Sequence, residues 1–133
     1  MIMGQKGTGK TKQLIELVGE AIENEKGSVV CIERGNKLTY DINYKARLID
    51  SSHYQIEDYS MLKGFICGLY AGNYDISHIF IDSLYKVANC DDVEQIAPFI
   101  EWLEEFKNEN GVSFTVTVSA PVELAPERVA KHF

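Results

Sequence analysis

The fold is decided by eight residues near the start of the chain, Gly4-Gln5-Lys6-Gly7-Thr8-Gly9-Lys10-Thr11. They match the pattern Gly-x-x-x-x-Gly-Lys-Ser/Thr at every fixed position. Glycines let the backbone turn tightly and bring bare N–H groups against an anion, and a helix that follows adds unpaired first-turn amides. This glycine-rich segment therefore predicts a loop that cradles phosphates, with the Lys10 ammonium at the β- and γ-phosphates and the Thr11 hydroxyl on Mg²⁺.

The residues on either side of the segment suit a strand, a loop and a helix. Residues 1–3 are apolar and predict a very short strand. Residues 10–24 predict an amphipathic helix, because apolar side chains recur there at helical spacing, namely Leu14, Leu17, Val18, Ala21 and Ile22. Gly27 supplies the stop signal.

The rest of the chain alternates strand and helix patterns. We expect strands at residues 28–33, 76–82 and 112–118, a further short strand near 47–49, and helices over 58–71 and 91–109. This order predicts an α/β fold, a three-layer sandwich with a mostly parallel sheet of four to five strands, in one domain over residues 1–133. Polar residues alternate along the last strand, which indicates that one of its faces is less well covered. Within the second helix, Gly64 and Gly68 are expected to serve packing, and the tail could carry one short helix after Pro126.

Composition narrows the classes of partner. The chain has 20 acidic and 13 basic residues and a net charge of −7, with no basic patch in the sequence, so we expect no direct nucleic-acid binding. The apolar runs are too short to cross a membrane. The glycine-rich segment starts at residue 4, which leaves no room for a leader, and the cysteines are three, widely spaced and without a CxxC pattern. We therefore expect a cytoplasmic protein.

A second motif ends the strand expected at residues 76–82. Apolar residues there are followed by Asp82, the form of a carboxylate that binds Mg²⁺ beside a phosphate loop. The alternative is a plain capping or turn-initiating aspartate.

These two motifs give the chain its resemblance to a known family. It resembles a P-loop NTPase (Walker A motif) of the ATPase branch that includes RecA-like and twitching-motility ATPases. The resemblance implies that Mg-nucleotide lies at the carboxyl ends of the strands, on the glycine-rich segment and Asp82. It also implies Glu33 as the residue that activates water and Ser119 as a sensor of the γ-phosphate. The chain departs from many such ATPases at Ser83, where a glutamate would follow the strand aspartate.

The sequence thus predicts a Mg²⁺-dependent ATP-binding protein with slow ATPase activity, which could self-associate or bind a protein partner. ATP is preferred over GTP because no Asn-Lys-x-Asp segment is present. Two alternatives stay open: an interaction module that binds nucleotide without hydrolysing it, and a small-molecule kinase. The only arginines, Arg34, Arg47 and Arg128, are expected to be surface charges. The tyrosines at positions 40, 44, 54 and 59 are candidates for an adenine platform, with ordinary packing as the alternative.

Overall fold

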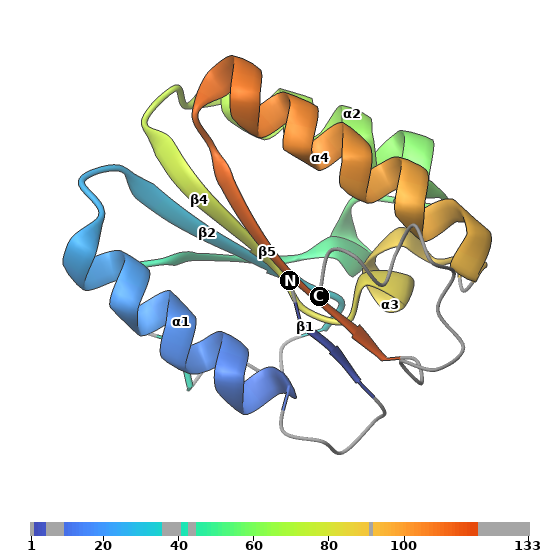
Figure 1. Cartoon of the computed structure of the whole chain (residues 1–133), viewed down its shortest axis with the longest axis horizontal. Helices are drawn as coiled ribbons and strands as arrows, with labels where there is room; N and C mark the ends of the chain where they lie inside the picture. Colours follow the sequence, from blue (N-terminus) through green and yellow to red (C-terminus); the bar gives the residue numbers. More distant parts are fainter. Residues whose placement is uncertain (1, 5–9, 36–40, 43–44, 91, 120–133) are drawn as a thin grey trace.

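The computed structural model describes residues 2–4, 10–35, 41–42, 45–90 and 92–119, and of residues 2–4, 10, 93 and 119 the backbone alone. Five strands pair in parallel in the order β1-β5-β4-β2-β3 (Figure 1). Their bounds are β1 (Ile2–Gly4), β2 (Ser28–Glu33), β3 (Arg47–Asp50), β4 (Ile76–Ile81) and β5 (Ser113–Ser119). The last strand of the sequence therefore lies between the first strand and β4.

Helices cover both faces of this sheet. The main ones are α1 (Lys10–Asn24), α2 (Tyr59–Gly72) and α4 (Ile96–Asn110), with the short α3 (Leu84–Ala88) and 3₁₀ turns at Ser51–His53 and Val93–Gln95. In Figure 1, α1 lies on one side of the sheet and α2 and α4 lie on the other. The predicted α/β architecture with a parallel sheet of four to five strands is confirmed.

The core has two parts of unequal size, one on each face. The larger part joins α2, α3 and α4 to one face of the strands, through residues such as Ile32, Ile81 and Val116. The smaller part joins α1 to Val29, Cys31 and Phe80 on the other face. Among the described residues α1 is the one long helix on that face, which makes it the less fully covered side.

This asymmetry explains the polar alternation along β5. Val116 and Val118 point to the larger core, so the alternating Thr115 and Thr117 point to the α1 face. Their hydroxyls form hydrogen bonds there rather than packing against apolar side chains. Thr117 is nevertheless 1% exposed, so the polar alternation marks hydrogen-bonded side chains and not an open face at this position.

Some boundaries differ from the sequence patterns. The helix expected from residue 91 begins at Ile96, with Pro98 in its first turn, where a proline is tolerated because first-turn amides lack helical partners. The five-residue α3 was not predicted, because a run that short has no measurable period. The packing role expected of Gly64 and Gly68 is wrong: a Cβ built on either glycine meets no atom within 4 Å.

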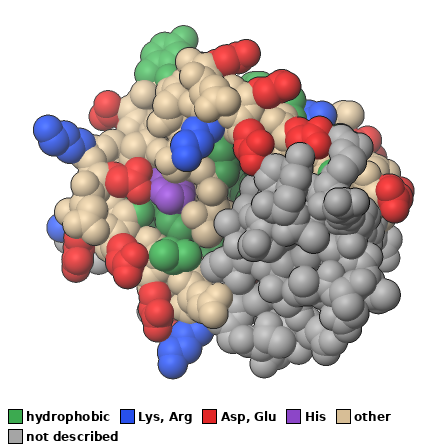
Figure 2. Space-filling view, in the orientation of Figure 1, with side chains coloured by type: hydrophobic (Ala, Val, Ile, Leu, Met, Phe, Trp, Pro, Cys, Tyr) green, Lys and Arg blue, Asp and Glu red, His purple; other side chains and the backbone are tan. Residues whose placement is uncertain are grey.

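The surface and the helices bear on the expected partners. Within the described ranges, no helix has the length and apolar character that a membrane span needs. Acidic side chains are spread over the described part of the face drawn in Figure 2, and the lysine and arginine side chains visible there stand apart from one another.

Candidate functional site

The glycine-rich segment connects a strand to a helix, as its pattern predicts. β1 ends at Gly4 and α1 begins at Lys10. Gly4 pairs with Ser119 of β5, so both predicted positions lie at the carboxyl ends of neighbouring strands. The predictions for Gln5, Lys6, Gly7, Thr8 and Gly9, and for the side chains of Lys10 and Ser119, fall outside the described residues.

The contact that defines the site joins the first turn of α1 to the end of β4. The hydroxyl of Thr11 lies 3.4 Å from Oδ1 and 3.5 Å from Oδ2 of Asp82, although 71 residues separate the two in sequence. Asp82 follows the last residue of β4 and is only 8% exposed. The two side chains predicted to bind Mg²⁺ therefore face one another.

A threonine that the sequence reasoning missed holds Asp82 in this position. The hydroxyl of Thr117 donates a hydrogen bond of 2.8 Å to Oδ1 of Asp82 and accepts one of 2.7 Å from the backbone N–H of Ser83. Thr117 is 1% exposed, so both bonds are shielded from water. The alternation of Ser113, Thr115 and Thr117 was the available signal, and it indicated the face but not the partner.

The turn after β4 has an unusual backbone. Ser83 has φ +61°, a left-handed conformation that non-glycine residues rarely adopt. The N–H of Asp82 donates to the carbonyl of Ile32 and the N–H of Ser83 to Thr117, so hydrogen bonds hold both amides of the turn. Such conformations persist only where the surrounding structure fixes them, and they concentrate at functional sites.

Glu33 is buried at the end of β2, on the same face. It is 3% exposed, which rules out a solvated turn residue. Strand alternation puts it on the side of Cys31, which packs against α1. Burial, then the charges of Asp82 and Glu33, raise the pKa of the Cys31 thiol to about 12. Because Ile32 pairs with Ile81, Glu33 and Asp82 follow at the same level of neighbouring strands, and both carboxylates therefore lie at the carboxyl end of the sheet on the α1 face.

The side chains of this cluster fit the coordination chemistry of Mg²⁺. Hydroxyl and carboxylate oxygens are the ligands that this ion prefers, and adjacent ligands of an octahedral Mg²⁺ lie about 3 Å apart. Thr11 and Asp82 are nearly at that spacing. Among the described residues no group of three or more His, Cys, Asp or Glu side chains could hold a metal ion.

The described tyrosines belong to packing clusters. Tyr59 is 4% exposed, and its ring lies 5.2 Å from that of Phe99. Tyr54 is half-exposed, and the centroid of its ring lies 5.3 Å from that of Phe65. Tyr40 and Tyr44 lie outside the described residues, as does Arg128, whereas Arg34 and Arg47 are exposed as expected.

A second group of polar side chains, formed by Glu25, His78 and Thr115, lies near the start of β4 on the α1 face. The imidazole of His78 pairs through Nε2 with the Thr115 hydroxyl at 2.9 Å and through Nδ1 with Glu25 at 2.8 Å. It also stacks on Phe80 at 4.1 Å. Burial lowers the pKa of His78, against the raising influence of Glu25. These contacts tie the end of α1 to the sheet and leave the imidazole no role at Asp82.

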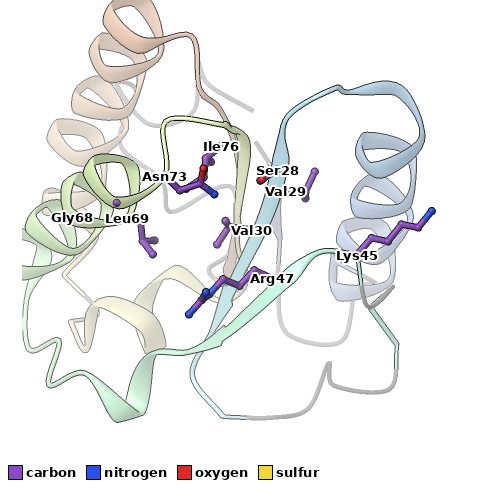
Figure 3. Close-up of a pocket in the computed structure, with 10 residues that line it drawn as sticks. Ser28, Val29, Val30, Lys45, Arg47, Gly68, Leu69, Asn73 and Ile76 are labelled. Atoms are coloured by element: carbon purple, nitrogen blue, oxygen red, sulfur yellow. The ribbon is translucent and has the colours of Figure 1, made fainter.

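A cleft of about 320 Å³ lies at the amino ends of β2 and β4 (Figure 3). Gly68 and Leu69 of α2 border it, and Arg47 extends from β3 beside it. Because Thr11 and Asp82 lie at the carboxyl ends of the parallel strands, this cleft is at the opposite edge of the sheet. It is separate from the candidate site.

No protein-family model matches the chain, and a search of curated proteins finds no match either.

Proposed function

We propose that this chain is a P-loop NTPase that binds ATP with Mg²⁺ on residues 4–11 and hydrolyses it slowly. The observation that carries the proposal is the approach of the Thr11 hydroxyl to both carboxylate oxygens of Asp82. Lys10 and Thr11 end the glycine-rich segment and begin α1, and the helix brings the threonine to the carboxylate that follows β4, where a P-loop site would hold its Mg²⁺. A glycine-rich turn that binds no ligand would give no reason for Thr11 to approach Asp82.

The residues of the cluster have distinct roles in this proposal. Thr11 and Asp82 hold the Mg²⁺ of the nucleotide, and bound Mg²⁺ neutralises charge on the phosphates. Thr117 positions the carboxylate of Asp82, and Lys10 binds the β- and γ-phosphates. Glu33 orients the attacking water and accepts its proton, and its burial beside Asp82 supports that assignment.

A nucleotide-dependent module without hydrolysis is the second candidate, and Ser83 favours it. This residue occupies the position after Asp82, and its N–H is bound to Thr117. The residue after Asp82 therefore has no carboxylate that could activate water, and Glu33 is left as the candidate general base.

Nucleotide binding is tested by titrating ATP and GTP with and without Mg²⁺ into the parent protein and two lysine variants. Lys10→Ala should abolish binding, whereas Lys12→Ala, which removes an exposed lysine two residues further along α1, should leave the Kd unchanged. Equal affinity of Lys10→Ala and the parent protein for Mg-ATP would refute the site.

Hydrolysis is tested by phosphate release from the parent protein and from Glu33→Gln. Release from the parent that falls at least about 100-fold in the variant supports the ATPase, given the usual contribution of a general base. Tight Mg-ATP binding with no release from either protein supports the module.

A further inference from the structure

A second hollow, of about 180 Å³, lies at the carboxyl edge of the sheet, on the face away from α1. Its polar lining comes from Arg34 after β2, Ser51 and Gln55 after β3, and Lys86 and Asn89 in and after α3. Its apolar lining, Ile56 and Val87, belongs to the larger core on the α2 and α4 side. The hollow is therefore separated by the sheet from Thr11, which lies on α1.

The charges that line this hollow favour an anion. Arg34 and Lys86 are both exposed, and neither forms an ion pair among the described residues. One nitrogen of the Arg34 guanidinium donates a hydrogen bond of 3.0 Å to the Asn89 side chain, which fixes the orientation of its plane. Among the described residues of the lining, Glu57 is the single carboxylate. A guanidinium with an ammonium beside it is a pairing that suits phosphate oxygens.

One residue of the lining carries a buried hydroxyl without a partner. Ser51 lines the hollow and is 3% exposed, and its Oγ has no hydrogen-bond partner. Its neighbour Ser52 is different, because its hydroxyl donates a bond of 2.7 Å to Asp50. This hydroxyl has less than 1 Å² of accessible surface, so Ser51 forms part of the wall, and an anion in the hollow would be held by the exposed Arg34 and Lys86.

We propose that this hollow binds the phosphate group of a small molecule, independently of the nucleotide site. Its volume of about 180 Å³ is enough for a phosphate group. A more open hollow of about 400 Å³ adjoins it and shares Arg34, Lys86 and Asn89. An organic part attached to the phosphate would lie there.

The test is a titration of ¹⁵N-labelled protein with inorganic phosphate and with phosphoserine, at constant ionic strength and without Mg²⁺. A loop that holds nucleotide phosphates would also bind these ions, so both titrations are run on the parent protein and on Lys10→Ala. We expect saturable shifts of the backbone amides of Arg34, Ser51, Gln55 and Asn89 in both proteins, with a Kd on the order of millimolar for such exposed charges. Tighter binding of phosphoserine identifies a phosphate ester as the ligand, and equal binding identifies free phosphate.

Three variants and a control separate this site from general attraction to cations. Arg34→Gln and Lys86→Gln should each raise the Kd at least about tenfold, as the loss of a charge-assisted hydrogen bond does. Arg47→Gln, which removes an exposed cation beside the other cleft, should leave it unchanged. Ser51→Ala should change neither the Kd nor the stability, since its hydroxyl has no partner and less than 1 Å² of accessible surface. The proposal is overturned if Lys10→Ala shows no saturable shifts at these amides, or if Arg34→Gln and Arg47→Gln change the Kd equally.

Discussion

Thr117→Val is the sharpest test of how the candidate site is held together. The substitution keeps the shape of the side chain but removes the hydroxyl that donates to Asp82 and accepts from Ser83. A hydrogen bond to a charged group contributes about 1.5–3 kcal/mol, and leaving a buried N–H unpaired costs about 1–3 kcal/mol. Asp82 retains 8% exposure, so water offsets part of the loss, and we expect the free energy of unfolding to fall by about 2–4 kcal/mol.

The assay is urea unfolding followed by the fluorescence of Trp102, the only tryptophan of the chain. The matched control is Thr115→Val, on the same strand and face, which loses its bond to the imidazole of His78 and should cost about 1 kcal/mol. The Kd for Mg-ATP should rise in Thr117→Val and stay unchanged in Thr115→Val, because of these two threonines it is Thr117 that contacts Asp82. Equal stability of the two variants, or an unchanged Kd in Thr117→Val, would refute the positioning role.

Three further predictions concern protonation, close packing and thiol reactivity. Burial lowers the pKa of His78 below its ordinary 6.5, so the imidazole takes up a proton more readily in the unfolded chain than in the folded one. The free energy of unfolding should therefore fall as the pH drops below about 6.5. Urea unfolding at pH values from about 5 to 7.5 should show a smaller fall in His78→Gln than in the parent protein. A Cβ on Gly27 would collide with the Asp75 carbonyl, so Gly27→Ala should lose at least about 1 kcal/mol in thermal unfolding. Gly19→Ala, in open space within α1, should instead gain about 0.5–1 kcal/mol. A thiol reagent at pH 8 should modify the exposed Cys67 and spare Cys31 until the protein is unfolded, and modification of both at equal rates in the native state would contradict the raised pKa of Cys31.

The sequence predicted the main strands and the layers because their signals are local. Apolar spacing in α1 and the β-branched run of β2 each depend on a few consecutive residues. The approach of Thr11 to the end of β4 could also be predicted, since an apolar run that ends in Asp82 is the form of a carboxylate that would share Mg²⁺ with the threonine.

The remaining features depend on contacts that no local pattern records. Thr117 looked like an ordinary polar residue of a half-covered strand, and its role appears only when β5 lies beside β4. The α3 helix depends on the left-handed residues Ser83 and Asn89 at its two ends, neither of which is glycine. The hollow with Arg34 and Lys86 joins segments that are 52 positions apart, and no pattern in either segment predicts that the two come together.

The order of strands has a consequence for how the chain matures on the ribosome. Of the strands that the structure describes, β1 is made first, but the neighbour with which it pairs is β5, which is made after all the others. A nascent chain that has not yet exposed residues 113–119 can assemble β2, β3 and β4, yet it leaves the first strand without that neighbour and Asp82 without the hydroxyl of Thr117. A ligand that needs the end of β1 and Asp82 together would therefore find both held in place only once residues 113–119 have been made.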